Sequence, residues 1–438
     1  MKLETPDKIR DLQRGLYLKA KREPKFRFYL LHDKVWREDI LKHAYRLVRA
    51  NGGAPGIDGE TFQSIESGEG EAKFVLKLQQ ELKEKTYRAQ AVRRVYIPKA
   101  DGKKRPLGIP TIRDRVAQMA VKLVIEPIFE ADFEECSYGF RPKRDAHQAV
   151  GAIRQALYNG HAYVFDADLN QYFDTIPHSK LLTLVAHRIS DRHILGWIKQ
   201  WLMAVVVEED EEGKRRTRKA KRGTPQGGVL SPLLANIYLH LFDRALLTYC
   251  QAAGLAAQLV RYADDFVILM CAGVNETLLR VKQVLGRMEL TLNEEKSRVV
   301  DAREGGFNFL GFAFCRKRNR QTGKGIILVE PSRKSQLHFR EEVRHLTGRW
   351  SHCLREEEVL DRVNRYVRGW VNYFHLYNST RPFRRQRFFL EQRIRKYLQK
   401  RRQRKGFGMK RWSTTRLYRE LGLCNIPVHA PYRRTRMP

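Results

Sequence analysis

The chain has 438 residues and is 42% hydrophobic, which is enough for about two to four folded domains with a sizeable core. Its 84 lysine and arginine residues outnumber its 49 aspartate and glutamate residues, giving a formal net charge of +35. A charge of this size repels itself unless a polyanion shares it, so nucleic acid is the first expected partner and an anionic membrane surface the second.

The cysteines and the N-terminal segment favour a cytoplasmic protein. Six cysteines are scattered without a C-x-x-C pair, which argues against a zinc module and against a disulfide framework. The N-terminus is charged and lacks the apolar core of a signal peptide, and no apolar run reaches the ~18 residues of a membrane span. We therefore expect a reducing, cytoplasmic environment and no membrane association.

Residues 1 to 50 are predicted to be mostly helical and basic. A turn-rich loop is expected at 51–62, and two strands joined by a basic turn at 91–110. Amphipathic periodicity predicts helices over 8–21, 37–51, 73–87 and 113–133.

From 161 to 318 the pattern becomes mixed helix and strand. Apolar runs predict strands at 161–169 and 307–314, a hairpin within 203–224, and a second hairpin around 264–265. Helices are expected after 176–180, over the buried segment 231–250, and over the amphipathic segment 276–290.

Past about residue 330 the chain is predicted to be helical again. The segment 359–378 places five large apolar residues on one face, which favours core packing over a binding face: Leu360, Val363, Val367, Trp370 and Phe374. The segment 381–412 holds fourteen lysine and arginine residues and one acid. Six aromatic residues are interleaved with them: Phe383, Phe388, Phe389, Tyr397, Phe407 and Trp412.

Two adjacent aspartates, Asp264 and Asp265, lie between apolar runs that resemble buried strands. Two more, Asp166 and Asp168, share one face of the strand at 161–169. An isolated pair of aspartates more often makes a turn. Here the second acidic strand and the net charge favour a site where divalent cations and phosphates offset the carboxylates, and hard oxygen ligands of this kind suit Mg²⁺.

The motifs, in order, resemble those of group II intron-encoded reverse transcriptases/maturases. "YADD" (262–265) resembles the active-site hairpin of reverse transcriptases, and "DADLNQYFDTIPH" (166–178) resembles their first palm motif. Further matches are "GAPGIDGETF", "RVYIPKADGKKRPLGIPTIRDRVAQ", "SYGFRPKRDAHQAV", "GTPQGGVLSPLLANIYL", "LTLNEEKS", "FNFLGFAF" and "RGWVNYF". Together these motifs span nearly the whole chain.

The resemblance implies an α+β right-hand polymerase with fingers, a palm with an antiparallel sheet, a helical thumb, and basic helical extensions at both ends. The expected divisions are an N-terminal extension (1–75), fingers and palm (76–320), thumb or maturase domain (321–400) and basic tail (401–438). No Cys-rich H-N-H nuclease module follows the tail, so we expect an endonuclease-lacking bacterial type.

The resemblance also implies site roles. Asp168, Asp264 and Asp265 would be catalytic and would bind two Mg²⁺ ions, with the Leu169 carbonyl as a further ligand and Asp166 as an upstream position outside the ligand set. The incoming nucleotide would contact six residues: Lys99, Arg105, Phe173, Gln226, Gly227 and Lys296. Among these, Phe173 would exclude a ribose 2′-OH, and Lys296 would protonate the leaving pyrophosphate. The alternatives are a core position for Phe173 and a solvated basic turn for Lys99 and Arg105.

The basic segments are expected to bind nucleic acid, because arginine mixed with aromatics suits phosphate contacts and stacking on unpaired bases. The candidate contacts are Arg141, Arg384, Arg385, Arg387, Arg393, Lys400, Arg401, Arg402, Arg404 and Lys405. The implied partners are group II intron RNA, an RNA template with a DNA primer, target DNA and dNTPs. Two alternatives stay open: a non-catalytic RNA-folding maturase, and a domesticated reverse transcriptase in phage defence, spacer acquisition or repair.

Overall fold

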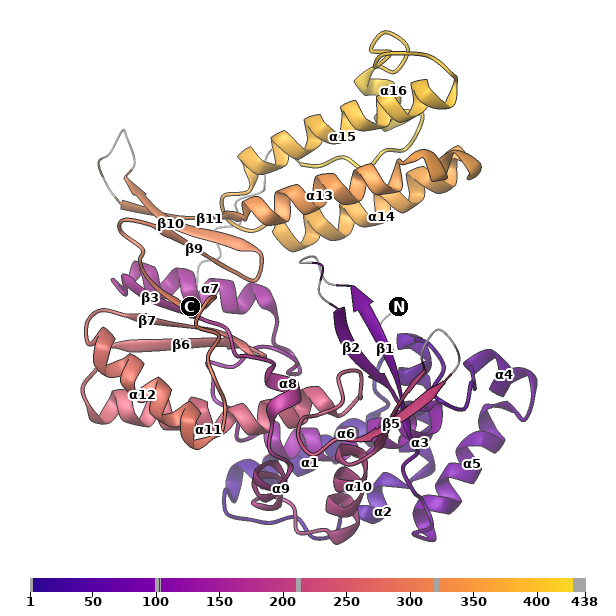
Figure 1. The fold of residues 1–438 in the computed structure, drawn as a ribbon, viewed down its shortest axis with the longest axis vertical. Coiled ribbons are helices and arrows are strands. Elements are labelled where there is room, and N and C mark those ends of the chain that lie inside the picture. The colour runs from indigo at the N-terminus through magenta and orange to yellow at the C-terminus, as the bar shows by residue number, and fades with distance from the viewer. Residues whose placement is uncertain are drawn as a thin grey trace. The chain divides into compact units, whose positions relative to one another are not determined.

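The computed structural model describes residues 3–98, 102, 104–209, 214–318, 323 and 325–427 (Figure 1). The chain forms two compact units. The first comprises Met1–Asp145, Ala167–Phe266 and Gly273–Arg298; the second comprises Ala146–Asp166, Val267–Ala272 and Val299–Pro438. Both units contain helices and strands, which confirms a mixed helix-and-sheet fold consistent with the α+β class.

The N-terminal part of the first unit is helical, as predicted. Its helices are α1 (Asp7–Arg22), α2 (His32–Val35), α3 (Glu38–Asn51), α4 (Phe62–Ser67), α5 (Gly70–Lys83) and α6 (Ile112–Glu130). The apolar stripe of α3 is buried at Ile40, Leu41, Ala44 and Val48. Helices α1 and α3 both pack on α6, most of whose residues are buried.

A four-stranded sheet follows, with strand order β2-β1-β4-β5. Strands β1 (Val92–Pro98) and β2 (Lys104–Ile109) pair antiparallel, as predicted for 91–110. Strands β4 (Val205–Glu209) and β5 (Arg215–Lys219) form the expected hairpin, and β4 runs parallel to β1. Lys99, in the turn between β1 and β2, lies outside the described residues.

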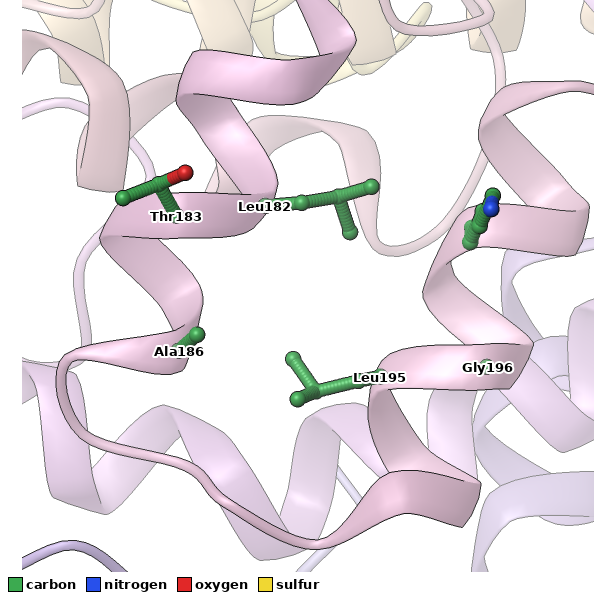
Figure 2. A pocket seen from close by; sticks show the side chains of 6 residues that line it. Leu182, Thr183, Ala186, Leu195 and Gly196 are labelled. Carbon is green, nitrogen blue, oxygen red and sulfur yellow. The ribbon is translucent and has the colours of Figure 1, made fainter.

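Three further helices of the first unit are α8 (Tyr172–Thr175), α9 (His178–Ala186) and α10 (Arg192–Leu202). Figure 2 shows a depression of about 330 Å³ lined mainly by short and apolar side chains of α9 and α10. Asp191 begins α10 by accepting from the backbone N–H groups of His193 and Ile194.

A second four-stranded sheet has the order β6-β7-β3-β8. Its strands are β3 (Tyr163–Ala167), β6 (Ala257–Tyr262), β7 (Asp265–Met270) and β8 (Arg298–Asp301). Strand β7 is buried after its first residue, because its remaining side chains are all apolar. Helices α11 (Ser231–Ala252) and α12 (Val274–Arg287) confirm the helices expected over 231–250 and 276–290.

The prediction of one strand at 307–314 is wrong. The segment forms two strands of a three-stranded sheet ordered β11-β10-β9: β9 (Gly306–Phe309), β10 (Phe312–Arg318) and β11 (Gly325–Pro331). Leu310 and Gly311 have φ angles of 49° and 80°, which make a tight turn that pairs Phe309 with Phe312. The apolar run continues through the turn, but the alternation of phenylalanines does not, because Phe309 and Phe312 are three residues apart; this shift and Gly311 were the signals of a turn.

The remaining helices of the second unit are α7 (Ala146–Tyr158), α13 (Arg333–Leu346), α14 (Glu356–Phe374), α15 (Thr380–Arg401) and α16 (Thr414–Arg419), with a 3₁₀ turn at Arg349–Cys353. Helices α14 and α15 both pack on α13 (Figure 1). The apolar face predicted for α14 is buried throughout, and Trp370 contacts the rings of Phe339, Phe374 and Phe383. Within the described residues, no helix combines the length and the apolar composition that crossing a bilayer requires.

Candidate active site

The turn between β6 and β7 carries Asp264 and is held by the buried side chain of Arg261. Arg261 has no exposed surface and donates from Nε and Nη2 to the two carboxylate oxygens of Asp243, at 2.8 and 2.5 Å. Its Nη1 donates to the Ala263 carbonyl at 2.9 Å and to Asn236 Oδ1 at 3.0 Å. Ala263 has a φ of 58°, a conformation that a non-glycine residue adopts at a cost. The arginine therefore fixes the strained turn on which Asp264 sits.

A neighbouring backbone segment also supports this turn. The Arg261 N–H donates to the Cys136 carbonyl, and the Tyr138 N–H donates to the Arg261 carbonyl, at 2.8 and 2.9 Å. A Cβ atom on Gly139 would collide with the backbone of Ala263, so only glycine fits there. These positioning residues were missed in the sequence, where the only signals were single polar residues inside otherwise apolar elements.

Asp168 follows the end of β3 and is held by the loop before β8. Lys296 Nζ donates to one carboxylate oxygen of Asp168 at 2.9 Å, and Asn293 Nδ2 lies 3.4 Å from the same oxygen. The backbone of Asn293 donates to the Asp168 carbonyl at 2.8 Å. Leu169 is buried and forms a backbone bridge with Leu292. The predicted contacts Asp168 and Lys296 thus lie side by side.

Asp168 and Asp264 influence each other electrostatically. Burial raises the pKa of the Asp264 carboxyl, and the negative charge of Asp168 raises it further. The positive charges of Arg105 and Arg261 lower it, but less than these effects raise it. Asp168 and Asp264 therefore lie close enough to affect each other's ionisation. Added positive charge would stabilise the ionised form of both carboxyl groups. Asp265, the first residue of β7, is exposed.

Carboxylate oxygens are the donors that Mg²⁺ prefers, so the chemistry of these three residues fits that ion. Among the described residues, no three carboxylate, imidazole or thiol groups stand close enough together to hold a metal ion. Lys296 forms an ion pair with one carboxylate oxygen of Asp168. The three aspartates are of the residue type that binds Mg²⁺, and a bound Mg²⁺ ion would compete with the ammonium group of Lys296 for Asp168.

Gln226 links three parts of the first unit. Its side-chain oxygen accepts from Arg105 Nε at 3.2 Å, and its side-chain nitrogen donates to Asp174 at 2.9 Å. Its carbonyl accepts from the Gly108 N–H at 2.6 Å. Arg105 and Gln226, which the motifs predicted as nucleotide contacts, therefore touch each other. Because Gln226 also bonds Asp174, it connects strand β2 to helix α8.

Gly227 requires glycine for two reasons. Its φ of 117° is a conformation that side chains disfavour, and an added Cβ would lie 2.6 Å from the carbonyl oxygen of Gly108. The loop therefore approaches β2 at van der Waals contact.

Phe173 is half-buried in α8, so its ring is only partly covered by core. The ring meets that of Tyr172 edge to face, with centroids 5.5 Å apart. Its carbonyl accepts from the Thr224 N–H at 2.7 Å, which ties α8 to the loop that carries Gln226. Tyr172 itself is buried and donates to the Ala235 carbonyl at 2.6 Å.

The predicted nucleic-acid contacts divide into two groups. Several guanidinium groups are engaged within the protein. Arg141 is buried and pairs with Glu130, Arg387 bonds Glu391, Arg393 donates to Thr347, and Arg401 donates to the Leu354 carbonyl. The exposed residues of this set are Arg384, Arg385, Lys400, Arg402, Arg404 and Lys405.

An arginine cluster surrounds the buried side chain of Trp412, after the end of α15. The guanidinium carbons of Arg402, Arg416 and Arg411 lie 4.8, 5.1 and 5.9 Å from the ring centroid. The charge of Arg402 is the largest cause that lowers the pKa of Arg411. Like charges gathered in this way would be stabilised by a bound polyanion.

Comparisons with known proteins agree with this geometry. Residues 97–314 match the family described as reverse transcriptase (RNA-dependent DNA polymerase), and residues 336–418 match the maturase-specific domain of group II introns. Protein YkfC of Escherichia coli K12 is 33% identical over 368 residues, which cover 75% of this chain and 94% of YkfC. The chain belongs to the group II intron reverse transcriptase/maturase family.

Two other relatives are longer than this chain. The group II intron-encoded protein LtrA of Lactococcus lactis subsp. cremoris is 36% identical over 276 residues, which cover 62% of this chain and 43% of LtrA. An uncharacterized 91 kDa protein in a cob intron of Schizosaccharomyces pombe is 25% identical over 437 residues, covering 82% of this chain and 52% of that protein. The chain therefore spans about half the length of these two relatives.

Proposed function

We propose that the protein is an RNA-directed DNA polymerase that also binds group II intron RNA and assists its splicing and retrotransposition. The observation that carries the proposal is the placement of Asp168, held by Lys296, within electrostatic reach of Asp264 on a braced turn. Membership of the family supports the same reaction class.

In the proposed site, Asp168, Asp264 and Asp265 hold two Mg²⁺ ions, with the Leu169 carbonyl as a further ligand. When bound, such a pair of ions stabilises the attacking and leaving oxygens of an in-line phosphoryl transfer. The chain's own contribution is to fix two carboxylates on different strands. Arg261 holds one of them through the turn, and the loop carrying Asn293 and Lys296 holds the other.

The proposed nucleotide contacts follow from the neighbours of Gln226. Arg105 supplies a cation for the triphosphate, and Gly227 lets the loop lie close to β2. The half-buried ring of Phe173 excludes a ribose 2′-OH, so deoxynucleotides are preferred. Lys296 donates a proton to the leaving pyrophosphate. Lys99 is assigned to the triphosphate by resemblance alone.

The right-hand arrangement is part of the proposal. The sheet β2-β1-β4-β5 and its helices form the fingers, the sheet β6-β7-β3-β8 carries the palm, and α13, α14 and α15 form the thumb. An RNA template with its DNA primer, dNTPs and target DNA are the remaining partners.

Intron RNA is proposed to bind the exposed cations of α15 and the arginine cluster around Trp412. The maturase-specific match covers both. Guanidinium groups bind phosphate in bidentate fashion, and their number predicts a steep dependence of affinity on salt.

Primer extension tests the proposal. Purified protein with poly(rA), oligo(dT), dTTP and Mg²⁺ is expected to make cDNA, and the Asp168→Asn variant is expected to make none. A wild-type protein that binds intron RNA but makes no cDNA would instead favour a non-catalytic maturase.

A further inference from the structure

A polar cavity of about 410 Å³ lies within the second unit. Its lining residues come from strands β10 and β11, from the turn before α15 and from the beginning of α15. They include three cations, one carboxylate and one tyrosine: Lys317, Arg381, Arg385, Glu330 and Tyr377. Of these five residues, only Arg385 was expected to contact nucleic acid.

One wall of the cavity is the face of the β10–β11 hairpin. Lys317 pairs in register with Ile326, and Glu330 pairs with Ala313, so Lys317 and Glu330 share a face but lie four residues apart along the strands. Four residues span about 14 Å of extended chain, so Lys317 and Glu330 are not neighbours on this face.

The turn between α14 and α15 forms another part of the lining and is hydrogen-bonded to strand β11. Asn378 Oδ1 accepts from the Val329 N–H at 3.1 Å, and the Asn378 N–H donates to the Val329 carbonyl at 3.0 Å. The hydroxyl of buried Ser379 donates to the Leu376 carbonyl at 2.7 Å. These bonds hold Tyr377 in place with a φ of 61°.

The charges around the cavity are not neutralised by one another. In the described part of the chain, Lys317, Arg381, Arg385 and Glu330 form no ion pair. The positive end of α15 adds to the cations on the side of Arg381. The cavity therefore offers an anion site and, on the sheet wall, a carboxylate acceptor.

We propose that this cavity binds one unstacked nucleotide of a single-stranded RNA. Its phosphate lies against Arg381 and Arg385, and the amino group of its base donates to Glu330. A carboxylate accepts from the exocyclic amino group of guanine, cytosine or adenine, whereas uracil has no amino group. The guanidinium carbon of Arg154 lies 4.8 Å from the centroid of the Tyr377 ring, so this tyrosine forms part of the wall and no stacking on the base is proposed. The choice of RNA as the ligand rests on the proposed function; the site itself rests on the cavity and its charges.

Two exposed arginines supply a matched pair of variants. Either Arg355→Gln or Arg385→Gln removes one positive charge, but only Arg385 lines the cavity, whereas Arg355 lies just before α14 and away from the lining. Glu330→Gln removes the acceptor charge on the sheet wall, and Glu341→Gln, at an exposed position on α13, is its control.

The full chain is titrated with GMP, CMP and UMP in EDTA, and binding is followed by saturation-transfer NMR. We expect GMP and CMP to bind more tightly than UMP. Arg385→Gln should weaken all three about tenfold, while Arg355→Gln changes each less than about twofold. Glu330→Gln should remove the preference over UMP, and Glu341→Gln should keep it.

Equal losses in Arg355→Gln and Arg385→Gln, or no preference among the three nucleotides in the wild type, would overturn the inference. Thermal unfolding of each variant shows whether it is folded. Primer extension on the same preparations separates the two proposals, because a chain that makes cDNA without this binding refutes only the cavity site.

Discussion

The ammonium group of Lys296 lies 2.9 Å from a carboxylate oxygen of Asp168, although the two residues are 128 positions apart in the chain. The loop that carries Lys296 also donates a backbone N–H to the Asp168 carbonyl, so both the main chain and the side chain of Asp168 are held from one segment. This contact places a proton donor beside a proposed metal ligand.

Lys296→Ala is predicted to slow cDNA synthesis about 100-fold or more at saturating dNTP, because a positioned general acid contributes about 10²- to 10⁴-fold. Steady-state primer extension should show the loss in kcat with little change in KM. Lys296→Arg keeps the charge and serves as the control, and it should keep more activity than the alanine variant. A loss confined to KM would contradict the acid role and favour simple nucleotide binding.

Asp264→Asn is predicted to stabilise the metal-free protein at neutral pH. Burial raises the pKa of Asp264 in the folded state, so as pH rises through the ordinary aspartate value the unfolded state ionises first and the fold loses stability. The asparagine variant lacks this loss, and its melting temperature in EDTA should exceed that of the wild type by about 2 °C at neutral pH.

The same comparison has two internal checks. At acid pH, where the carboxyl is protonated in both states, the difference in melting temperature should vanish. Added Mg²⁺ should raise the melting temperature of the wild type more than that of the variant, because an ion that binds only the folded state stabilises it. A variant that is less stable than the wild type at neutral pH would count against the raised pKa.

Arg261→Met is predicted to destabilise the protein by about 3–5 kcal/mol, because it leaves the buried charge of Asp243 without a partner. The double variant Arg261→Met/Asp243→Leu should recover much of that stability in urea unfolding. It should not recover cDNA synthesis, because the bond to the Ala263 carbonyl stays lost. Full recovery of activity in the double variant would show that the arginine does not position the turn.

Gly227→Ala is predicted to raise KM for dNTP at least about tenfold, since the added Cβ forces the loop away from Gly108. Gly286→Ala is the matched control, because Gly286 lies in α12 with open space around its Cα. That change should leave primer extension intact and stabilise the helix by up to about 1 kcal/mol. Equal behaviour of the two variants would refute the close-approach argument.

Phe173→Ala is predicted to raise ribonucleotide incorporation, because the smaller side chain leaves room for a 2′-OH. Single-nucleotide extension with dTTP and UTP gives the selectivity ratio, which should fall about tenfold or more. Unchanged sugar selectivity would place Phe173 in the core instead of at the nucleotide.

Local patterns in the sequence predicted most elements of the fold. The basic turn in 91–110 predicted the β1–β2 hairpin, and the five-residue stripe predicted the buried face of α14. The prediction failed at Leu310 and Gly311, where an apolar run continues through a two-residue turn and only the spacing of the phenylalanines changes. Turn conformation at a non-glycine residue depends on tertiary contacts that a strand pattern does not encode.

The motifs predicted the residues that are proposed to take part in the reaction, but not the residues that hold them in place. Asp168, Asp264, Arg105, Gln226 and Lys296 were expected from the motifs, and the structure places their side chains in contact or in electrostatic reach.

The residues that hold these groups were not foreseen, because the network joins segments far apart: Asn236 donates to the Gly139 carbonyl across 97 positions. Arg141 shows the reverse, since a basic motif residue expected at the surface is buried against Glu130.

The most direct test of the account measures cDNA synthesis and intron RNA binding side by side for the wild type and Asp264→Asn. The account predicts that the wild type extends oligo(dT) on poly(rA) with Mg²⁺, that Asp264→Asn makes no product, and that both bind intron RNA within about threefold of each other. Product from Asp264→Asn at the wild-type rate, or an equal loss of synthesis and RNA binding, would contradict it.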